Sequence, residues 1–443
     1  MGDKALSVGV SVEYLTETAA APVRVVLLHD RTGKVLALLP ANALLDLGRL
    51  GQLAGRELQP VKAEDAQRFF NQAALQTPAG REQLFTLPLL VDQSCPSGAL
   101  KCLEPHSGWQ CELARRPVHD RVLSGEFALT PTVPHAAVAG LSDDETVINR
   151  AVERFTSLRV RQRLDDLLGL PGMSDSMRTI VQLRSNPDAG VDDLVPVVKR
   201  DPSLSAQVMG WSSSPYYAAP GKVRSIEDAI IRVLGFDLVI NLALGVAMGK
   251  VMQLPDDTPR GSIYYWDQAL YTATLCERLA AKAQLDERPR PGLAYLSGLL
   301  HNFGYLVLAH LFPPHFSRLS RYIEANPHLE QQQIEHEVLH VTREQIGGWL
   351  LENWKLPDEV AAAVRFQQAP DLAGEHQVYA RLLFLASRLL RAEGLSDGPK
   401  AAPDEALMAH LGLEAEDVRQ AVAEVKAEAE NLSQVSRLFS QKH

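Results

Sequence analysis

A change of pattern between Thr130 and Asp144 divides this chain into two dissimilar parts. The stretch TPTVPHAAVAGLSDD combines two prolines, small residues and acids, a composition typical of a linker between domains. Short β-branched runs lie before it, and longer segments with helical spacing lie after it. Because 443 residues are too many for one ordinary core, we expect a multidomain protein whose domains differ in fold class.

The first part, residues 1–128, has the pattern of a mixed α/β domain. Val23–Leu28 and Val35–Leu39 are apolar runs separated by the turn-like sequence Asp-Arg-Thr-Gly, which predicts a β-hairpin. Leu44–Leu53 carries apolar residues at helical spacing. The runs Leu84–Val91 and Gln110–Ala114 indicate further strands.

The second part has the pattern of an all-α protein. Helix stops recur at residues 169–171, 186–187, 201–202 and 355–357, where proline follows a helical segment. We expect a linker and connecting helix over 129–164, a helical bundle over 165–390, and helices over 391–443 that complete or flank it. The last segment, Glu414–Leu438, has spaced valines among many charges, which predicts an exposed amphipathic helix. Its charged face is a candidate partner surface; the alternative, which is more common, is a face that only contacts water.

Composition excludes several classes of protein. A formal net charge of -10 argues against general binding to a phosphate backbone, so nucleic acid is not an expected partner. The N-terminal sequence lacks a secretory signal, and the apolar stretch Ala229–Met252 is interrupted by charged residues, so we expect a buried helix pair and a cytoplasmic protein. Cys95, Cys102 and Cys111 cluster without a CxxC pair, which favours ordinary reduced thiols near strands over a zinc site.

Several segments of the helical part, in order over about residues 165–390, resemble the HDOD domain, a relative of the HD phosphohydrolases that lacks their catalytic equipment. The segments that carry the resemblance are LPGM at 170–173, DPSLSAQVM at 201–209, VRSIEDAI at 223–230 with Leu234-Gly235, Trp266–Ala273, GLLHNFG at 298–304, His340–Trp354, and Leu356-Pro357. The SSS sequence at 212–214 departs from the family's Asn-Ser pair. The ordered set predicts the fold more strongly than any single motif.

The resemblance also locates the site that an active HD enzyme would use. Such an enzyme needs several His and Asp ligands around a divalent metal that activates water. Here His301 is followed by Asn302 where the dyad needs aspartate, Gln367-Gln368 stand at the His-His region, and Ser387 lies near the final aspartate; His340 is retained in a later helix. We therefore expect no catalytic residues, no metal and no cofactor.

What remains of that site is a candidate ligand pocket formed by His301, Asn302, His340 and Gln367. The alternative is structural, because a histidine on an apolar helix face is more often a hydrogen-bonded core residue than a ligand. His336 and His340 also spell HExxH with Glu337, but no third zinc ligand is evident, which makes a protease a remote alternative.

The first part, over about residues 10–125, resembles the YbaK and prolyl-tRNA-synthetase-associated editing domains. The resemblance is carried by Val26–Leu28, Val35–Pro40 and Leu45–Leu50. The family's deacylase lysine would fall near Arg24, and its substrate loop has no convincing equivalent around Phe85–Gln93. We expect an editing-like fold whose chemistry is lost.

These resemblances imply a bacterial signal-transduction protein, not an enzyme, that acts through protein partners or a small ligand. The first alternative is a divergent metal-dependent phosphohydrolase of nucleotides or cyclic dinucleotides. The second is a module that recognises tRNA or an aminoacyl group, which salt-dependent tRNA binding would support.

Overall fold

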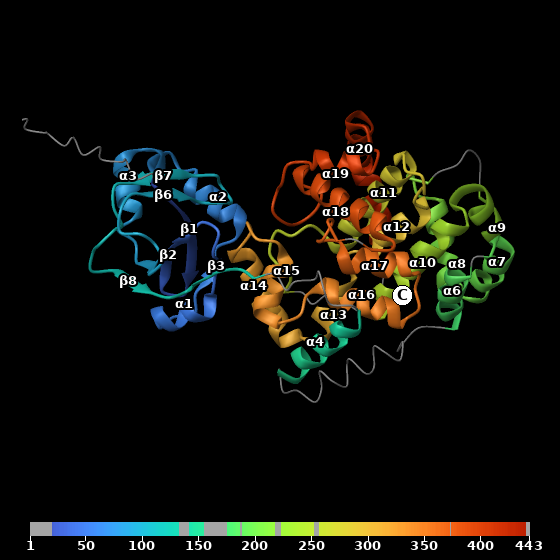
Figure 1. Ribbon diagram of the computed structural model, residues 1–443, viewed down its shortest axis with the longest axis horizontal. Helices are drawn as coiled ribbons and strands as arrows, with labels where there is room; N and C mark the ends of the chain where they lie inside the picture. The colour runs from blue at the N-terminus through green and yellow to red at the C-terminus, as the bar shows by residue number, and fades with distance from the viewer. Residues whose placement is uncertain are drawn as a thin grey trace, which may run out of the picture. The chain divides into compact units, whose positions relative to one another are not determined.

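A computed structural model describes residues 20–132, 141–154, 175–186, 188–217, 223–251, 257–372 and 374–439. The chain divides into two units, Met1–Leu129 and Thr130–His443 (Figure 1). The expected classes are confirmed: the first unit mixes strands and helices, and the second is mostly helical. The LPGM motif at 170–173 lies outside the described residues.

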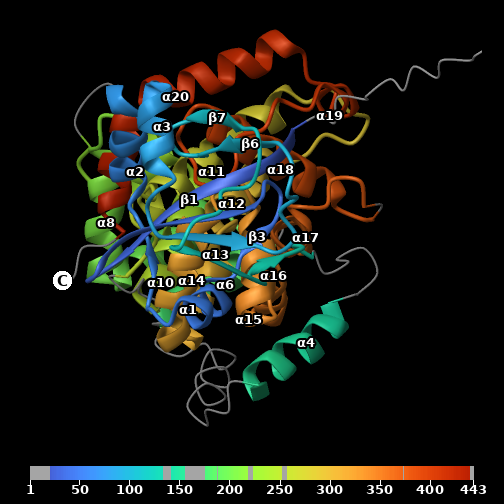
Figure 2. The same cartoon turned by 90° about the vertical axis from the view of Figure 1, so that its left-hand side faces the viewer.

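The N-terminal unit is built on a twisted mixed sheet, seen in Figure 2. Strands β1 (Ala21–Asp30) and β2 (Gly33–Pro40) form the expected antiparallel hairpin at its centre, with Asp30 paired with Gly33. In the described residues the strand order is β7-β6-β1-β2-β5-β8, and β4 also pairs with β1. The further strands are β3 (Leu44–Leu45), β4 (Gln59–Pro60), β5 (Leu89–Asp92), β6 (Leu100–Leu103), β7 (Gln110–Leu113), β8 (Val122–Gly125) and β9 (Ala128–Leu129).

Local sequence explains where the helices of this unit begin and end. Helix α1 (Leu47–Ala54) starts at Asp46, whose carboxylate accepts hydrogen bonds from the N–H groups of Gly48 and Arg49. It ends at Gly55, which has a φ of 62° that glycine adopts readily. Helices α2 (Ala63–Phe70) and α3 (Pro78–Leu84), with the 3₁₀ turn Ala73–Gln76, contribute side chains to the apolar core on one face of the sheet.

In the described residues, helices end before the predicted stops at 201–202 and 355–357, whereas the stop at 169–171 lies outside them. Helix α7 ends at Arg200, and Asp201 caps α8, accepting a hydrogen bond of 3.0 Å from Leu204 N. The described helices are α4 (Leu141–Arg154), α6 (Asp175–Ser185), α7 (Val191–Arg200), α8 (Pro202–Ser212), α9 (Ile226–Asp228), the π-helical turn Ala229–Leu234, α10 (Phe236–Val251), α11 (Tyr265–Lys282), α12 (Pro291–Leu300), α13 (Phe303–Leu311), α14 (Pro313–Ala325), α15 (Gln331–Leu339), α16 (Arg343–Asn353), α17 (Asp358–Phe366), α18 (Gln377–Ala392), α19 (Glu405–His410) and α20 (Ala415–Arg437).

Helices α11 and α12 form the centre of this unit, and a glycine sets their distance. A Cβ on Gly298 would lie 2.6 Å from Ala273 Cα, so the two backbones approach too closely for a larger residue. The apolar stretch 229–251 forms the expected pair of helices, which bend by 111° at Gly235. Among the described residues, one helical stretch, Pro291–Leu311, is long and apolar enough to cross a membrane, and most of it is buried in the protein.

The C-terminal helix α20 is amphipathic, as expected, but it is not a free surface helix. Its apolar face packs on α11, with Val418, Val425 and Leu432 buried. Its charged side adds ion pairs from Glu424 and Glu428 to Arg278. The expectation of an exposed helix was therefore wrong for one face, because the valines cover α11; the opposite face remains exposed.

Candidate functional site

His301 and Asn302 lie at the junction between α12 and α13, inside the helical unit. His301 is buried, and its Nδ1 lies 2.7 Å from the carbonyl oxygen of Gly298. Since that carbonyl can only accept, Nδ1 carries the proton and donates. Burial, with the nearby charges of Arg343 and Arg391, lowers the pKa of His301 to about 4, so the ring is neutral at physiological pH.

The structure brings His301, Asn302 and Gln367 to one small cavity of about 20 Å³, the inner pocket. Gln367 Nε2 donates to the backbone oxygen of His301 at 2.8 Å and thereby ties α17 to the α12–α13 junction. Gln368 and Ser387, the other positions where the resemblance places lost ligands, also line the pocket. A cavity of this size holds about one water molecule and no nucleotide.

His340 does not line the inner pocket. It caps the C-terminus of α15 with a φ of 59°, and α16 begins only at Arg343, so His340 belongs to the turn between these helices. Its ring centroid lies 6.4 Å from that of His336. The structure therefore separates His340 from the other three predicted pocket residues.

A buried arginine supplies the positive charge beside Asn302. Arg343 Nη1 donates to Asn302 Oδ1 at 3.0 Å, and its Nε donates to Glu335 Oε1 at 2.6 Å. The backbone N–H of Arg343 also donates to Glu335 Oε2 at 2.9 Å, and the guanidinium lies over the ring of Tyr305, 4.5 Å from its centroid. The pair of Arg343 and Glu335 was not identified from the sequence. The capping box formed by Thr342 and Gln345 is visible in the sequence, but it indicates only that Arg343 lies at the start of a helix.

The remaining charges of the inner pocket are also largely matched within the fold. Arg391 Nη1 donates to both carboxylate oxygens of Glu330, at 3.0 and 2.8 Å. Glu344 is not paired in this way: its Oε2 is buried without a hydrogen-bond partner among the described residues, and burial together with the charge of Glu335 raises its pKa to about 7.

These residues do not fit a divalent metal ion. Asn302 presents a neutral amide oxygen that Arg343 already occupies, and the guanidinium groups of Arg343 and Arg391 would repel a second cation at close range. Within the described ranges, no three His, Cys, Asp or Glu side chains come together in a way that could hold a metal.

Two glycines let the helices around the pocket touch. A Cβ on Gly304 would lie 1.8 Å from the carbonyl oxygen of Arg343, so α13 packs directly on the backbone of α16. Gly347 faces the same contact, with an ideal Cβ 3.1 Å from Gly304 N. The last residue of the GLLHNFG motif therefore has a packing function.

A second buried ion pair fastens α4 to the same helices. Asp144, fully buried, accepts hydrogen bonds from Arg365 on α17 and from Gln345 on α16, the latter at 3.2 Å. Gly348 leaves room for the arginine, since a Cβ there would lie 2.6 Å from Arg365 Cβ. The sequence predicts a linker and connecting helix over 129–164, which contains Asp144, and no local signal distinguishes Asp144 from Asp143.

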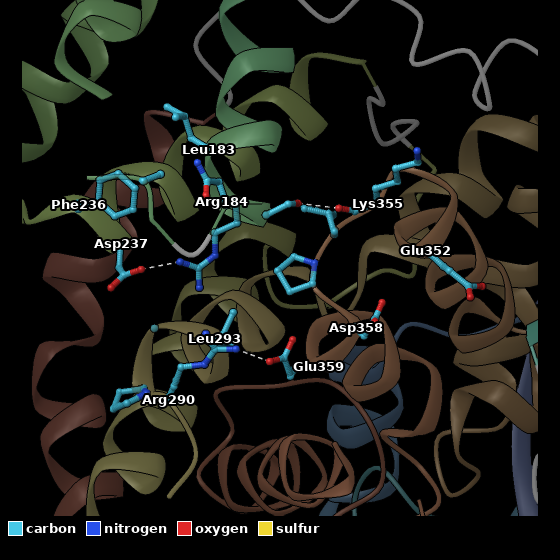
Figure 3. Close-up of a pocket in the computed structure, with 17 residues that line it drawn as sticks. Leu183, Arg184, Phe236, Asp237, Arg290, Leu293, Glu352, Lys355, Asp358 and Glu359 are labelled. Carbon is cyan, nitrogen blue, oxygen red and sulfur yellow. Dashed lines mark hydrogen bonds and ion pairs between the residues drawn. The ribbon is translucent and has the colours of Figure 1, made fainter. Parts of the chain in front are cut away.

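A separate outer cleft has a volume of about 800 Å³ and is shown in Figure 3. The N-terminal ends of α10, α12 and α17 meet there. Arg184 on α6 pairs with Asp237, and Arg290 pairs with Glu359. The Arg184 side chain is only 7% exposed and its Nε has no partner among the described residues, whereas Asp237 is 63% exposed. The other charged lining residues are Glu352, Lys355 and Asp358.

In the N-terminal unit, Arg24 lies on β1 with its side chain directed into the protein. It is buried, its Nη2 donates to the carbonyl oxygen of Ala43 at 3.0 Å, and burial lowers its pKa to about 9. The guanidinium is thus engaged in holding β1 to the turn after β2 and not presented to a substrate.

Comparison with known proteins identifies the helical part. Residues 170–370 match the model of the HDOD domain. A protein from Marinobacter aquaeolei VT8, whose crystal structure carries the provisional name of a signal transduction protein, is 38% identical in sequence to this chain. The two structures match with a TM-score of 0.83, over 95% of this chain and 94% of the Marinobacter chain.

Two other matches are more distant. An HDOD domain protein of unknown function from Geobacter sulfurreducens shares the fold, with a TM-score of 0.51, 21% identity, and coverage of 64% of this chain and 99% of that one. An uncharacterised protein of Treponema pallidum (strain Nichols) is 26% identical over 235 residues, which span 51% of this chain and only 44% of that relative. The editing-like identity of the first unit stays a prediction. The chain is an HDOD domain protein and belongs to the same family as the Marinobacter protein.

Proposed function

We propose that this protein is a non-catalytic, cytoplasmic signalling protein whose HDOD unit acts by binding a protein partner. The observation that carries the proposal is the state of the inner pocket. It has room for about one water molecule, and the guanidinium of Arg343 already donates a hydrogen bond to the amide oxygen of Asn302. A pocket filled in this way offers neither metal ligands nor space for a nucleotide.

The outer cleft is the better candidate for contact with a partner. Its volume of about 800 Å³ accommodates several side chains of another protein. Each of its two ion pairs has one exposed member, Asp237 at 63% and Arg290 at 66%, so a partner can exchange contacts with them at small cost. We therefore place the partner here instead of on the exposed face of α20.

The first experiment tests the absence of catalysis. Metal content is measured in untagged full-length protein and in His301→Ala, together with hydrolysis of nucleotides and cyclic dinucleotides. We expect no stoichiometric metal and no hydrolysis in either protein. Near-stoichiometric metal that is lost in His301→Ala would overturn the proposal and establish the metal-dependent phosphohydrolase instead.

The second experiment tests the place of contact. A photo-crosslinking residue is introduced at Lys355 in the outer cleft or, as a matched control, at Lys426 on α20, and the full chain is irradiated in its native host. We expect one protein to be crosslinked from position 355 and not from 426. The reverse result would move the partner surface to α20.

The aminoacyl or tRNA function remains the alternative for the first unit. Arg24 supports a loss of its chemistry, because the guanidinium that would replace the family's lysine is buried against Ala43. Salt-dependent binding of tRNA to the full chain would revive this function.

A further inference from the structure

Two cysteines of the N-terminal unit face each other across neighbouring strands. In the antiparallel pair β6–β7, Cys102 lies directly opposite Cys111. Opposed residues of such a pair have Cα atoms about 4.5–5.5 Å apart, which falls within the range of roughly 4.4–6.8 Å that disulfides span. Both side chains enter the apolar core on the same face of the sheet, with exposures of 0% and 5%.

The two thiols influence each other's ionisation, because their contact raises the pKa of Cys102 and lowers that of Cys111. A hydrogen bond from the Cys102 thiol lowers the pKa of Cys111, and the positive charge of Arg81 acts in the same direction against the effect of burial. By contrast, burial raises the pKa of Cys95 to about 12. It also raises the pKa of Cys276 in the helical unit. Cys111 is therefore the thiol best prepared to form a thiolate.

The position of β7 gives this pair a route to solvent. Among the described strands β7 lies at the end of the sheet and pairs only with β6. Its neighbour residues Gln110 and Glu112 point outward and are exposed. A strand held on one side opens locally at lower cost than a central strand such as β1.

We propose that Cys102 and Cys111 form a reversible oxidation site for low-molecular-weight disulfides such as glutathione disulfide. The Cys111 thiolate attacks one sulfur of the reagent, which forms a mixed disulfide and releases one glutathione thiolate. Cys102 then loses its proton, attacks the Cys111 sulfur and releases the second glutathione. Two protein thiols are oxidised to one disulfide, and one glutathione disulfide is reduced to two thiols.

The product would fasten β7 to β6 covalently beside Trp109. That indole packs against Phe70 with ring centroids 5.3 Å apart, and its Nε1 donates to the carbonyl oxygen of Leu75 at 3.2 Å. Oxidation therefore acts on the edge of the sheet next to the α2–α3 region. Where this unit carries its own binding function, the thiol pair makes that function sensitive to redox conditions.

The test uses the native full-length chain, equilibrated in glutathione redox buffers, then alkylated and mapped by mass spectrometry. We expect a Cys102–Cys111 disulfide, with Cys95 and Cys276 alkylated only after unfolding. In Cys102→Ser a glutathione adduct should accumulate on Cys111, whereas Cys111→Ser should leave Cys102 unmodified. Cys276→Ser is the matched control and should oxidise like the wild type.

Circular dichroism shows whether each variant is folded, and Cys102→Ala replaces Cys102→Ser where the serine does not fold. The proposal is overturned if all four thiols of the native protein stay reduced across the buffer series. It is also overturned if the disulfide joins Cys95, or if the adduct in Cys102→Ser forms on another cysteine.

Discussion

The inner pocket and the outer cleft are both lined by arginine–carboxylate pairs, yet the pairs differ in what surrounds them. Arg343 and Glu335 are both buried and are joined by several hydrogen bonds. Arg290 in the cleft is 66% exposed and meets Glu359 at the cleft wall. A pair that is fully enclosed cannot change partners without leaving a buried charge, whereas an exposed pair exchanges with water or another protein. The enclosed pair of Arg343 and Glu335 thus maintains the fold, whereas each pair in the cleft keeps one exposed member that is accessible to the proposed partner.

The largest expected effect separates these two classes of ion pair. Arg343→Met leaves Glu335 buried without its partner, which should lower the free energy of unfolding by about 3–5 kcal/mol. Urea unfolding followed by circular dichroism measures the change. A loss below about 1 kcal/mol would show that the inner pair behaves like a surface pair and would break the comparison.

The next effect concerns the packing that encloses the inner pocket. Gly304→Ala places a Cβ within 1.8 Å of the Arg343 carbonyl oxygen, so α13 and α16 must separate. We expect a loss of about 3 kcal/mol in the same unfolding experiment. Gly374→Ala is the matched control, because among the described residues no atom beyond its chain neighbours lies within 4 Å of a Cβ built there, and it should change stability little. Equal behaviour of the two variants would contradict a tightly closed pocket.

A pH series sharpens the comparison through Glu344. Its pKa rises from 4.5 to about 7 in the folded protein, so the folded state holds a proton that the unfolded state releases. This contribution to stability is present in full below pH 4.5 and is lost as the pH rises toward and through 7. The stability of wild type relative to Glu344→Gln should therefore fall between pH 5 and pH 8, measured by urea unfolding at each pH.

His301 acts in the opposite direction in that series. Its pKa falls from 6.5 to about 4 on folding, so the unfolded state binds more protons between these values and stability rises with pH there. Glu344→Gln retains this rising trend, which serves as an internal control. A flat difference between wild type and Glu344→Gln would mean that Glu344 is ionised in both states.

The smallest effect is expected in the outer cleft. Arg290→Met removes the exposed member of its ion pair with Glu359, which should change the free energy of unfolding by less than about 1 kcal/mol. The partner contact proposed above should nevertheless weaken, as crosslinking from position 355 would report. A stability loss as large as that of Arg343→Met would remove the distinction between the two regions.

The fold was readable from the sequence wherever the signal is local. The Asp30–Gly33 turn between two apolar runs gave the central hairpin, and Asp201-Pro202 marked the start of α8. Both depend on neighbouring residues alone. The burial of one face of α20 could not be predicted from the sequence, because the spacing of its valines reveals an apolar face but not the helix that packs against it.

The candidate site was readable in part for a similar reason. The motif positions predicted His301, Asn302 and Gln367 as one group, and these three residues line one cavity. No recognised sign in the sequence indicated the turn that places His340 outside that cavity. Arg343 and Glu335 went unnoticed, because charged residues in a helical sequence are expected to face water. Their burial depends on the pairing of Arg343 with Glu335, eight residues earlier in the chain, and on the absence of a side chain at Gly304.

The attachment of α4 means that the cooperative folding unit extends beyond the family match. Arg365 lies within residues 170–370, but its carboxylate partner, Asp144, precedes that range. A shortened chain that begins at residue 165 would expose the site of α4 and leave a guanidinium without a counterion in the interior. Such a fragment should aggregate or express poorly, whereas one that begins at residue 141 should not. The practical boundary of this domain is therefore set by an ion pair and not by sequence similarity.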